Sequence, residues 1–102
     1  MSDASIRQGS VGELLLAGVI DYRSGPALRE AGGKLIGAST ESVLSINCAG
    51  VEKSSSVGLS LLLAFMRDAN AVSKSLEIRD LPADMRDIAE VSGLLELLPL
   101  HV

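Results

Sequence analysis

The chain has 102 residues, enough for one domain spanning residues 1–102, and its 47% apolar content includes only two aromatic side chains, so we expect an aliphatic core. A net charge of −4 excludes the basic footprint of a nucleic-acid binder and the polybasic segment of a membrane-surface protein. A single cysteine, Cys48, excludes an internal disulfide, and the lack of a signal peptide or of about 20 consecutive apolar residues predicts a cytoplasmic protein.

The first predicted elements form a hairpin. Ala4–Gln8 and Glu13–Ala17 have the pattern of strands, and Gly9–Gly12 between them holds two glycines that favour a tight turn. A further apolar pair at residues 19–20 leads into Asp21.

A helix is expected next. The Ser-Gly-Pro run at residues 24–26 provides a cap and a proline that suits a first helical turn. Leu28, Ala31 and Leu35 recur on one helical face, and we predict that they form its buried stripe.

The middle of the chain predicts a strand, a helix and a second strand. Ser42–Cys48 is a short apolar run without helix or strand breakers, so we expect a buried strand followed by a turn over Ala49–Ser55. A strong helical pattern runs from Gly58 to about Ala69, and Leu76–Arg79 alternates apolar and polar residues as a strand does.

The last part predicts two helices. Asp80 can cap the first of them, Gly93 can end it, and its inner stripe would consist of Met85, Ile88 and Ala89. A short closing helix would follow within residues 94–98. The resulting order, β-β-α-β-α-β-α-α, predicts an α/β fold, because strands joined through helices of ten or more residues pair in parallel while the initial hairpin is antiparallel.

The segment from Ser54 to Gly58 is the candidate functional feature. If the following helix begins here, Ser55 or Ser56 becomes its N-cap, and a hydroxyl in that place accepts a backbone N–H. A phosphate on the same hydroxyl would be favoured by the free N–H groups and by the helix dipole.

The helix that follows is apolar on nearly every side. Leu59, Leu62, Leu63 and Met66 make one stripe, while Leu61 and Phe65 lie on another side. Such a helix needs two apolar neighbours. One is the sheet, and the second is either another helix of this chain or a partner protein.

Three segments resemble the STAS domain family, the anti-sigma-factor antagonists and their relatives. Ser55-Ser56-Val57-Gly58-Leu59 resembles the family's Asp-Ser-Ser-Gly-Leu or Asp-Thr-Ala-Gly-Leu signature between a strand and a helix. Residues 17–21 resemble its Gly-x-hydrophobic-Asp segment, and residues 88–94 its late helix ending in Gly-Leu. The resemblance covers about Ser5 to Pro99 and implies a mixed sheet of four to five strands with the helices mainly on one face.

Within the family, the chain most resembles the MlaB-type group, the small cytoplasmic STAS subunits of phospholipid-trafficking (Mla-type) ABC transporters. The resemblance implies a non-enzymatic protein that binds and supports the transporter's ATP-binding-cassette ATPase. The partner-binding residues would be Asp21, the serine-rich turn and the adjacent helix surfaces, including residues 82–92. In the turn and in the helix that follows it, the set is Ser54, Ser55, Ser56, Val57, Gly58, Leu61 and Phe65.

The alternative implied by the family is an anti-sigma-factor antagonist switched by phosphorylation of Ser56. The sequence departs from the signature where Ser55 replaces the aspartate and Val57 replaces a small residue. Loss of the carboxylate beside Ser56 counts against the kinase-switched branch more than against a docking role.

Enzymatic chemistry has little support in the residues. His101 is the only histidine, no Gly-x-Ser-x-Gly elbow and no phosphate-binding Gly-Lys-Ser/Thr motif occurs, and one Cys with one His cannot make a structural zinc site. We therefore expect no metal and no cofactor. A homodimer through an apolar face and a lipid or other small ligand beside the central helix remain open.

Overall fold

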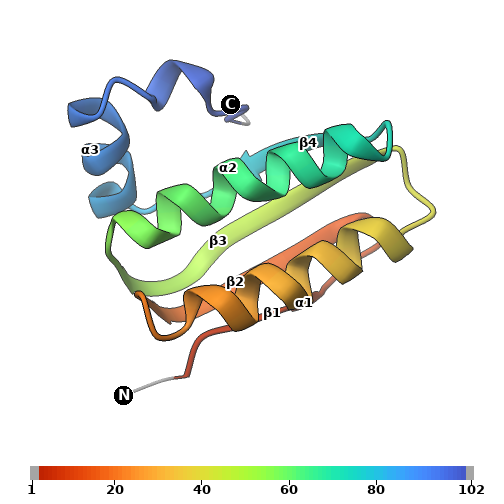
Figure 1. Ribbon diagram of the computed structural model, residues 1–102, viewed down its shortest axis with the longest axis horizontal. Helices are drawn as coiled ribbons and strands as arrows, with labels where there is room; N and C mark the ends of the chain where they lie inside the picture. Colours follow the sequence, from red (N-terminus) through yellow and green to blue (C-terminus); the bar gives the residue numbers. More distant parts are fainter. Residues whose placement is uncertain (1–2, 101–102) are drawn as a thin grey trace.

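A computed structural model describes residues 3–100 as one four-stranded sheet with its helices on one face (Figure 1). The strands are β1 (Ser5–Gln8), β2 (Glu13–Ile20), β3 (Val43–Ser54) and β4 (Ser75–Arg79). The helices are α1 (Gly25–Ala38), α2 (Ser56–Ala71) and α3 (Ala83–Val91), followed by the short 3₁₀ helix η1 (Leu95–Leu97).

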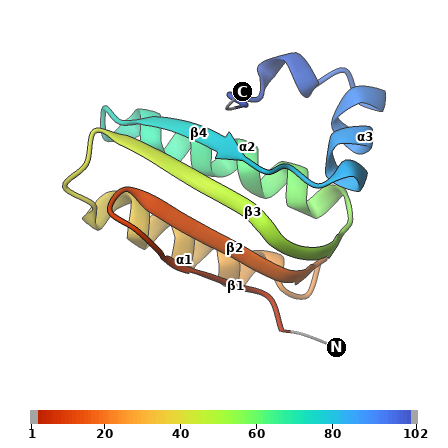
Figure 2. The ribbon, with the colours of Figure 1, turned by 180° about the vertical axis from the view of Figure 1, so that it is seen from behind.

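The strands lie in the order β1-β2-β3-β4, with β1 antiparallel to β2 and the other pairs parallel. This arrangement confirms the mixed sheet expected from the sequence, because the hairpin is followed by helical crossovers. Figure 2 shows the strands from the side that α1 and α2 leave uncovered. The prediction that the helices gather on one face is also confirmed.

The core lies between the sheet and these helices. Buried residues alternate along β2, where Leu14, Leu16 and Ile20 point toward the helices. Leu44, Ile46 and Cys48 of β3 do the same. This period of two is the pattern of strands that bury one face.

Two strands extend further than the sequence predicted. β2 runs without a break to Ile20, and β3 runs to Ser54 where a turn was expected over Ala49–Ser55. Gly50 makes the extension feasible, because a Cβ at this position would lie 2.9 Å from Cβ of Ala17 on the neighbouring strand. Register shifts between β2 and β3 let the longer strand keep pairing despite its polar end.

The buried face of α1 also differs from the predicted stripe. The chain buries Leu28 as expected, but its other buried positions are Gly25, Gly32 and Ile36, while Ala31 is exposed and Leu35 is half-buried. Gly32 decides this orientation: a Cβ there would overlap the ring of Phe65 in α2. Because Gly32 has no side chain, α1 and α2 can approach each other closely at this position.

Two expected helix boundaries are corrected. α2 begins at Ser56 and not at Gly58, and Pro82 is the N-cap residue of α3 in place of Asp80, which has a φ of 54°. Met85 and Ala89 form the buried stripe of α3, and Ile88 is half-buried beside them. A short helix after Gly93 is confirmed as η1.

Candidate docking site

The serine-rich turn lies where the parallel strands β2 and β3 end together. Ile20 and Ser54 are register partners, so Asp21 and Ser55 follow them at the same edge of the sheet. The Ser55 N–H donates to the Ile20 carbonyl over 3.0 Å and joins the two loops. The carboxyl edge of parallel strands is where α/β sheets usually present functional loops.

Ser54 belongs to the interior and not to the surface. Its side chain is buried, and its hydroxyl donates to the Ser55 carbonyl over 2.8 Å. Gly58 makes room for it, because a Cβ at this position would overlap the Ser54 Oγ and would lie 3.0 Å from Cε of Met85. Ser54 and Gly58 thus set the path of the turn, and neither offers a side chain to a partner.

Ser55 and Ser56 are both exposed but differ in role. Ser55 is the N-cap of α2, and its Oγ accepts the Val57 N–H over 3.2 Å. Ser56 is the first helical residue, and its hydroxyl makes no hydrogen bond within residues 3–100. The free hydroxyl therefore stands in solvent at the positive end of the α2 dipole.

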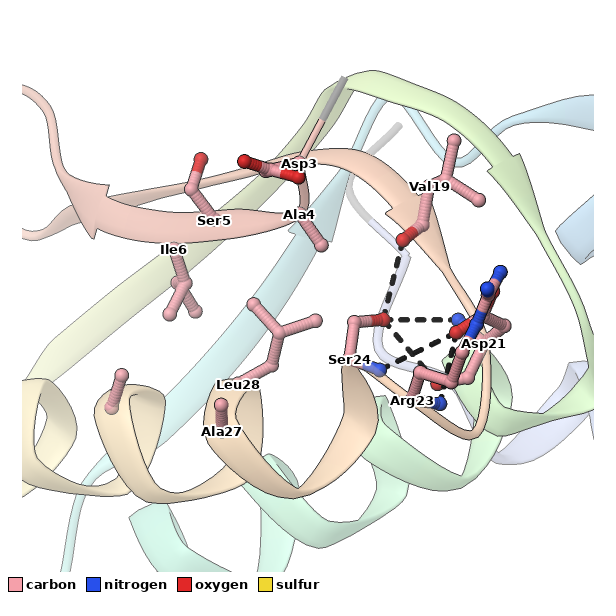
Figure 3. A pocket seen from close by; sticks show the side chains of 11 residues that line it. Asp3, Ala4, Ser5, Ile6, Val19, Asp21, Arg23, Ser24, Ala27 and Leu28 are labelled. Carbon is pink, nitrogen blue, oxygen red and sulfur yellow. Dashed lines mark hydrogen bonds and ion pairs between the residues drawn. The ribbon is translucent and has the colours of Figure 1, made fainter. Parts of the chain in front are cut away.

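Asp21 organises the neighbouring turn. Its carboxylate accepts the Arg23 N–H at 2.9 Å, accepts the Ser24 N–H at 3.3 Å and pairs with the Arg23 guanidinium at 2.8 Å. These donors, Arg23 first, lower the pKa of Asp21 below its usual value. Figure 3 shows this network at the start of α1, with the Ser24 hydroxyl donating to the Val19 carbonyl.

The sequence did not identify Tyr22 as part of this surface. Its side chain is 77% exposed, and the Arg23 guanidinium lies 5.8 Å from its ring centroid. Aromatic side chains and arginine are enriched at protein interfaces. The residues on either side of Tyr22 predicted a turn, but no sequence pattern showed that the ring points into solvent.

Two further predicted docking residues, besides Ser54 and Gly58, are buried. Leu61 is 4% exposed and Phe65 is fully buried, so neither reaches the surface of the chain. Phe65 lies against Gly32 of α1, and Val57 packs near Gly25 at the start of the same helix. The second apolar neighbour of α2, left open by the sequence, is therefore another helix of this chain.

α3 flanks the turn from the other side. Met85 anchors it against the base of α2, next to Gly58. The outer surface of α3 is exposed and carries Asp84, Arg86, Asp87, Glu90 and Val91. Val91 is 90% exposed, so this surface combines an acidic character with one free apolar side chain.

Residues 3–100 contain no group of three or more His, Cys, Asp or Glu side chains able to hold a metal ion. Burial, and secondarily the Asp80 carboxylate, raises the pKa of Cys48 to about 12, so its thiol is not an activated nucleophile. His101 lies outside the described residues.

None of the helices within residues 3–100 combines the length and the apolar character needed to cross a membrane. The mixed sheet, the helices on one face and the capped turn at the strand ends together define a STAS-type domain. The family model described as "Mlab, STAS domain" matches residues 5–99, and the chain belongs to this family.

Solved structures agree with this assignment. A chain of the Acinetobacter MlaFEDB complex in an ATP-bound conformation is 25% identical, with a TM-score of 0.77 over 87% of this chain and 93% of that chain. An anti-sigma factor antagonist from Mycobacterium paratuberculosis is 24% identical, with a TM-score of 0.74 over 96% and 83%. The unphosphorylated anti-sigma factor antagonist SpoIIAA is 17% identical, with a TM-score of 0.72 over 97% and 88%.

The likeness to the two anti-sigma factor antagonists shows that this chain has the same fold as they do. A search of curated protein sequences finds no match to this chain.

Proposed function

We propose that the protein is a non-catalytic subunit that binds the ATP-binding-cassette ATPase of a phospholipid-trafficking, Mla-type ABC transporter. It would act at the cytoplasmic face of the inner membrane. The family match over residues 5–99 and the likeness to a chain of the MlaFEDB complex support this branch of the STAS family. The docking surface would consist of Tyr22, Ser55, Ser56 and the outer face of α3.

The observation that carries the proposal is the exposed Ser56 at the start of α2. It stands between the Asp21 turn and α3, and the backbone beneath it is fixed by the Ser55–Ile20 hydrogen bond. A surface held by strand ends and a helix cap needs little ordering when a partner binds, which lowers the entropic cost of association.

The charges on the surface indicate which kind of partner surface would fit it. The exposed side of α3 carries Asp84, Asp87 and Glu90 against one cation, Arg86. We therefore expect the matching surface of the ATPase to be basic opposite α3 and to offer an apolar pocket at its rim that receives Tyr22. Opposite charges at the rim speed association and make it sensitive to salt.

The experiment measures binding of the ATPase subunit to immobilised wild-type chain and to two variants. Ser56→Arg should weaken binding at least about tenfold, because a long charged side chain would occupy the centre of the interface. Thr40→Arg is the matched control, since Thr40 is exposed in the loop before β3 at the opposite end of the parallel strands. Equal affinity of the two variants, or no binding by the wild type, would refute the proposed surface.

The second candidate function is that of an anti-sigma-factor antagonist. The two antagonist structures with this fold and the free Ser56 hydroxyl at a helix N-terminus favour it. A phosphate on Ser56 would lie at the positive end of the α2 dipole, where the Val57 and Gly58 N–H groups already bond to Ser55. Ser55 supplies a neutral cap where the signature has a carboxylate. Stoichiometric phosphate on Ser56 after co-expression with a partner kinase, seen by mass spectrometry, would select this branch.

A further inference from the structure

The edge strand β1 is unpaired on its outer side. Within residues 3–100 it pairs only with β2, and Figure 2 shows it along the border of the sheet. Asp3 and Ala4 continue its path, because a Cβ at Gly18 of β2 would overlap the Asp3 carbonyl and lie 2.7 Å from Cα of Ala4. An open edge of this kind offers backbone groups to another strand.

The register shows which backbone groups face outward. The Gly9 N–H donates to the Glu13 carbonyl over 2.8 Å, and hydrogen-bonded pairs alternate along an antiparallel ladder. The odd-numbered residues of the strand therefore bond to β2. The N–H and C=O groups of Ala4, Ile6 and Gln8 point away from the sheet.

The side chains of this strand divide between the two faces. Ala4 and Ile6 are half-buried on the helix side, and Figure 3 shows them directed toward Leu28 of α1. Asp3 and Arg7 are exposed, lie at positions of the opposite parity and make no ion pair within residues 3–100. The strand thus carries an unpaired acid at one end and an unpaired base at the other.

A groove of about 560 Å³ runs between this strand and the first turns of α1. Ala4, Ile6 and Leu28 form its apolar floor, and Ala27 and Ala31 of α1 line its side. Both alanines are exposed, so the four-stranded sheet is too narrow to cover this side of α1. One further strand beside β1 would cover it.

We propose that this edge is the self-association surface of the protein, and that its occupant is β1 of a second copy. In an antiparallel pair centred on Ser5, Asp3 lies opposite the partner's Arg7, and Arg7 opposite the partner's Asp3. Ala4 then lies opposite the partner's Ile6, which enters the groove beside Ala31. The sequence Asp3-Ala4-Ser5-Ile6-Arg7 is therefore complementary to itself in charge and in size.

The charges select this register over its neighbour. A pair centred on Arg7 would set the two guanidinium groups directly opposite each other, which destabilises adjacent strands. In the register centred on Ser5, two opposite-charge pairs form and the outward groups of Ala4 and Ile6 bond to the partner. This surface lies on β1 and the adjoining side of α1, and the proposal does not depend on the identity of the partner that docks at Ser56.

Sedimentation equilibrium of the full chain tests the proposal. The wild type should show a monomer–dimer equilibrium. Asp3→Arg and Arg7→Asp should each raise the dimer dissociation constant at least about tenfold, because each sets like charges opposite one another at two places. The double variant with both changes should recover the wild-type constant within about threefold, since the pairs are re-formed with reversed polarity.

Arg67→Asp is the control, because Arg67 is an exposed cation on α2, outside the edge strand and the groove. Its dissociation constant should equal that of the wild type. A chain that stays monomeric up to about millimolar concentration, or a double variant as weak as the single ones, would overturn the proposal. A foreign strand as the natural occupant of this edge would give the first of these results.

Discussion

At the scale of single residues, the three serines at residues 54–56 have three different environments. Ser54 is buried beneath the turn, Ser55 caps α2 through its bond to the Val57 N–H, and Ser56 stands free in solvent. The residue that caps the helix and the residue whose hydroxyl is exposed to a partner are thus adjacent in the chain. A change at Ser55 should alter stability, and a change at Ser56 should alter recognition.

Ser55→Ala should lower the free energy of unfolding by about 1 kcal/mol, because the Val57 N–H loses its acceptor at the helix end. Urea denaturation followed by circular dichroism measures this difference. Ser60→Ala is the control in the next turn of the same helix, where the hydroxyl only donates to the Ser56 carbonyl over 3.4 Å. An equal loss in the two variants would contradict the assignment of Ser55 as the cap.

At the scale of elements, α1 shows how one helix can depend on a glycine and tolerate another. Gly32 faces the Phe65 ring of α2, whereas nothing lies within 4 Å of a Cβ placed at Gly37. The far end of α1 is closed by Lys74, whose ammonium donates to the Ile36 and Ser39 carbonyls. A cation at a helix C-terminus satisfies free carbonyls and complements the dipole.

Gly32→Ala and Gly37→Ala should change stability in opposite directions. The first forces α1 and α2 apart and should cost about 1–3 kcal/mol. The second should gain up to about 1 kcal/mol, because alanine is the better helix former and meets no neighbour. Thermal unfolding of both variants under one set of conditions checks the sign of each change. Destabilisation by Gly37→Ala would show that a side chain at this position does meet a neighbouring group.

At the scale of the whole molecule, one apolar layer joins the sheet to α1, α2 and α3. Cys48 lies fully buried in this layer, on the face of β3 that meets the helices. Its thiol has a pKa of about 12 chiefly because burial disfavours the thiolate. Its reactivity should therefore report opening of the whole layer.

The Cys48 thiol should react with a disulfide reagent at pH 8 only as fast as the chain unfolds. In denaturant above the unfolding midpoint, one thiol per chain should react at once, because the sequence contains a single cysteine. The measurement compares the rate of Cys48 labelling in native buffer with the unfolding rate. The unfolding rate is obtained from stopped-flow fluorescence of an added dye. Rapid labelling of the native chain would show that β3 opens locally.

Much of the fold could be predicted because its signals are local. The hairpin glycines, the apolar period of β2 and β3, and the stripe of α3 predicted the element order and the mixed sheet. The family signature at Ser55–Leu59 also marked the start of α2 closely. These features depend on residues adjacent in the chain.

The prediction of a turn over Ala49–Ser55 was wrong because of contacts with residues outside this segment. Its glycine and polar residues favour a loop, yet pairing with the end of β2 keeps it extended to Ser54. Tertiary pairing satisfied backbone groups that the local composition would have left to solvent.

The amino-acid sequence by itself determined the class of fold, the aliphatic core and the place of the serine-rich turn along the chain, because periodicity and turn chemistry act over a few residues. Only the tertiary structure decided which sides of the elements are free. Contact between Gly32 and Phe65 rotates α1, buries Phe65 and leaves Ala31 exposed, and no local pattern contains a contact between residues so far apart in the chain.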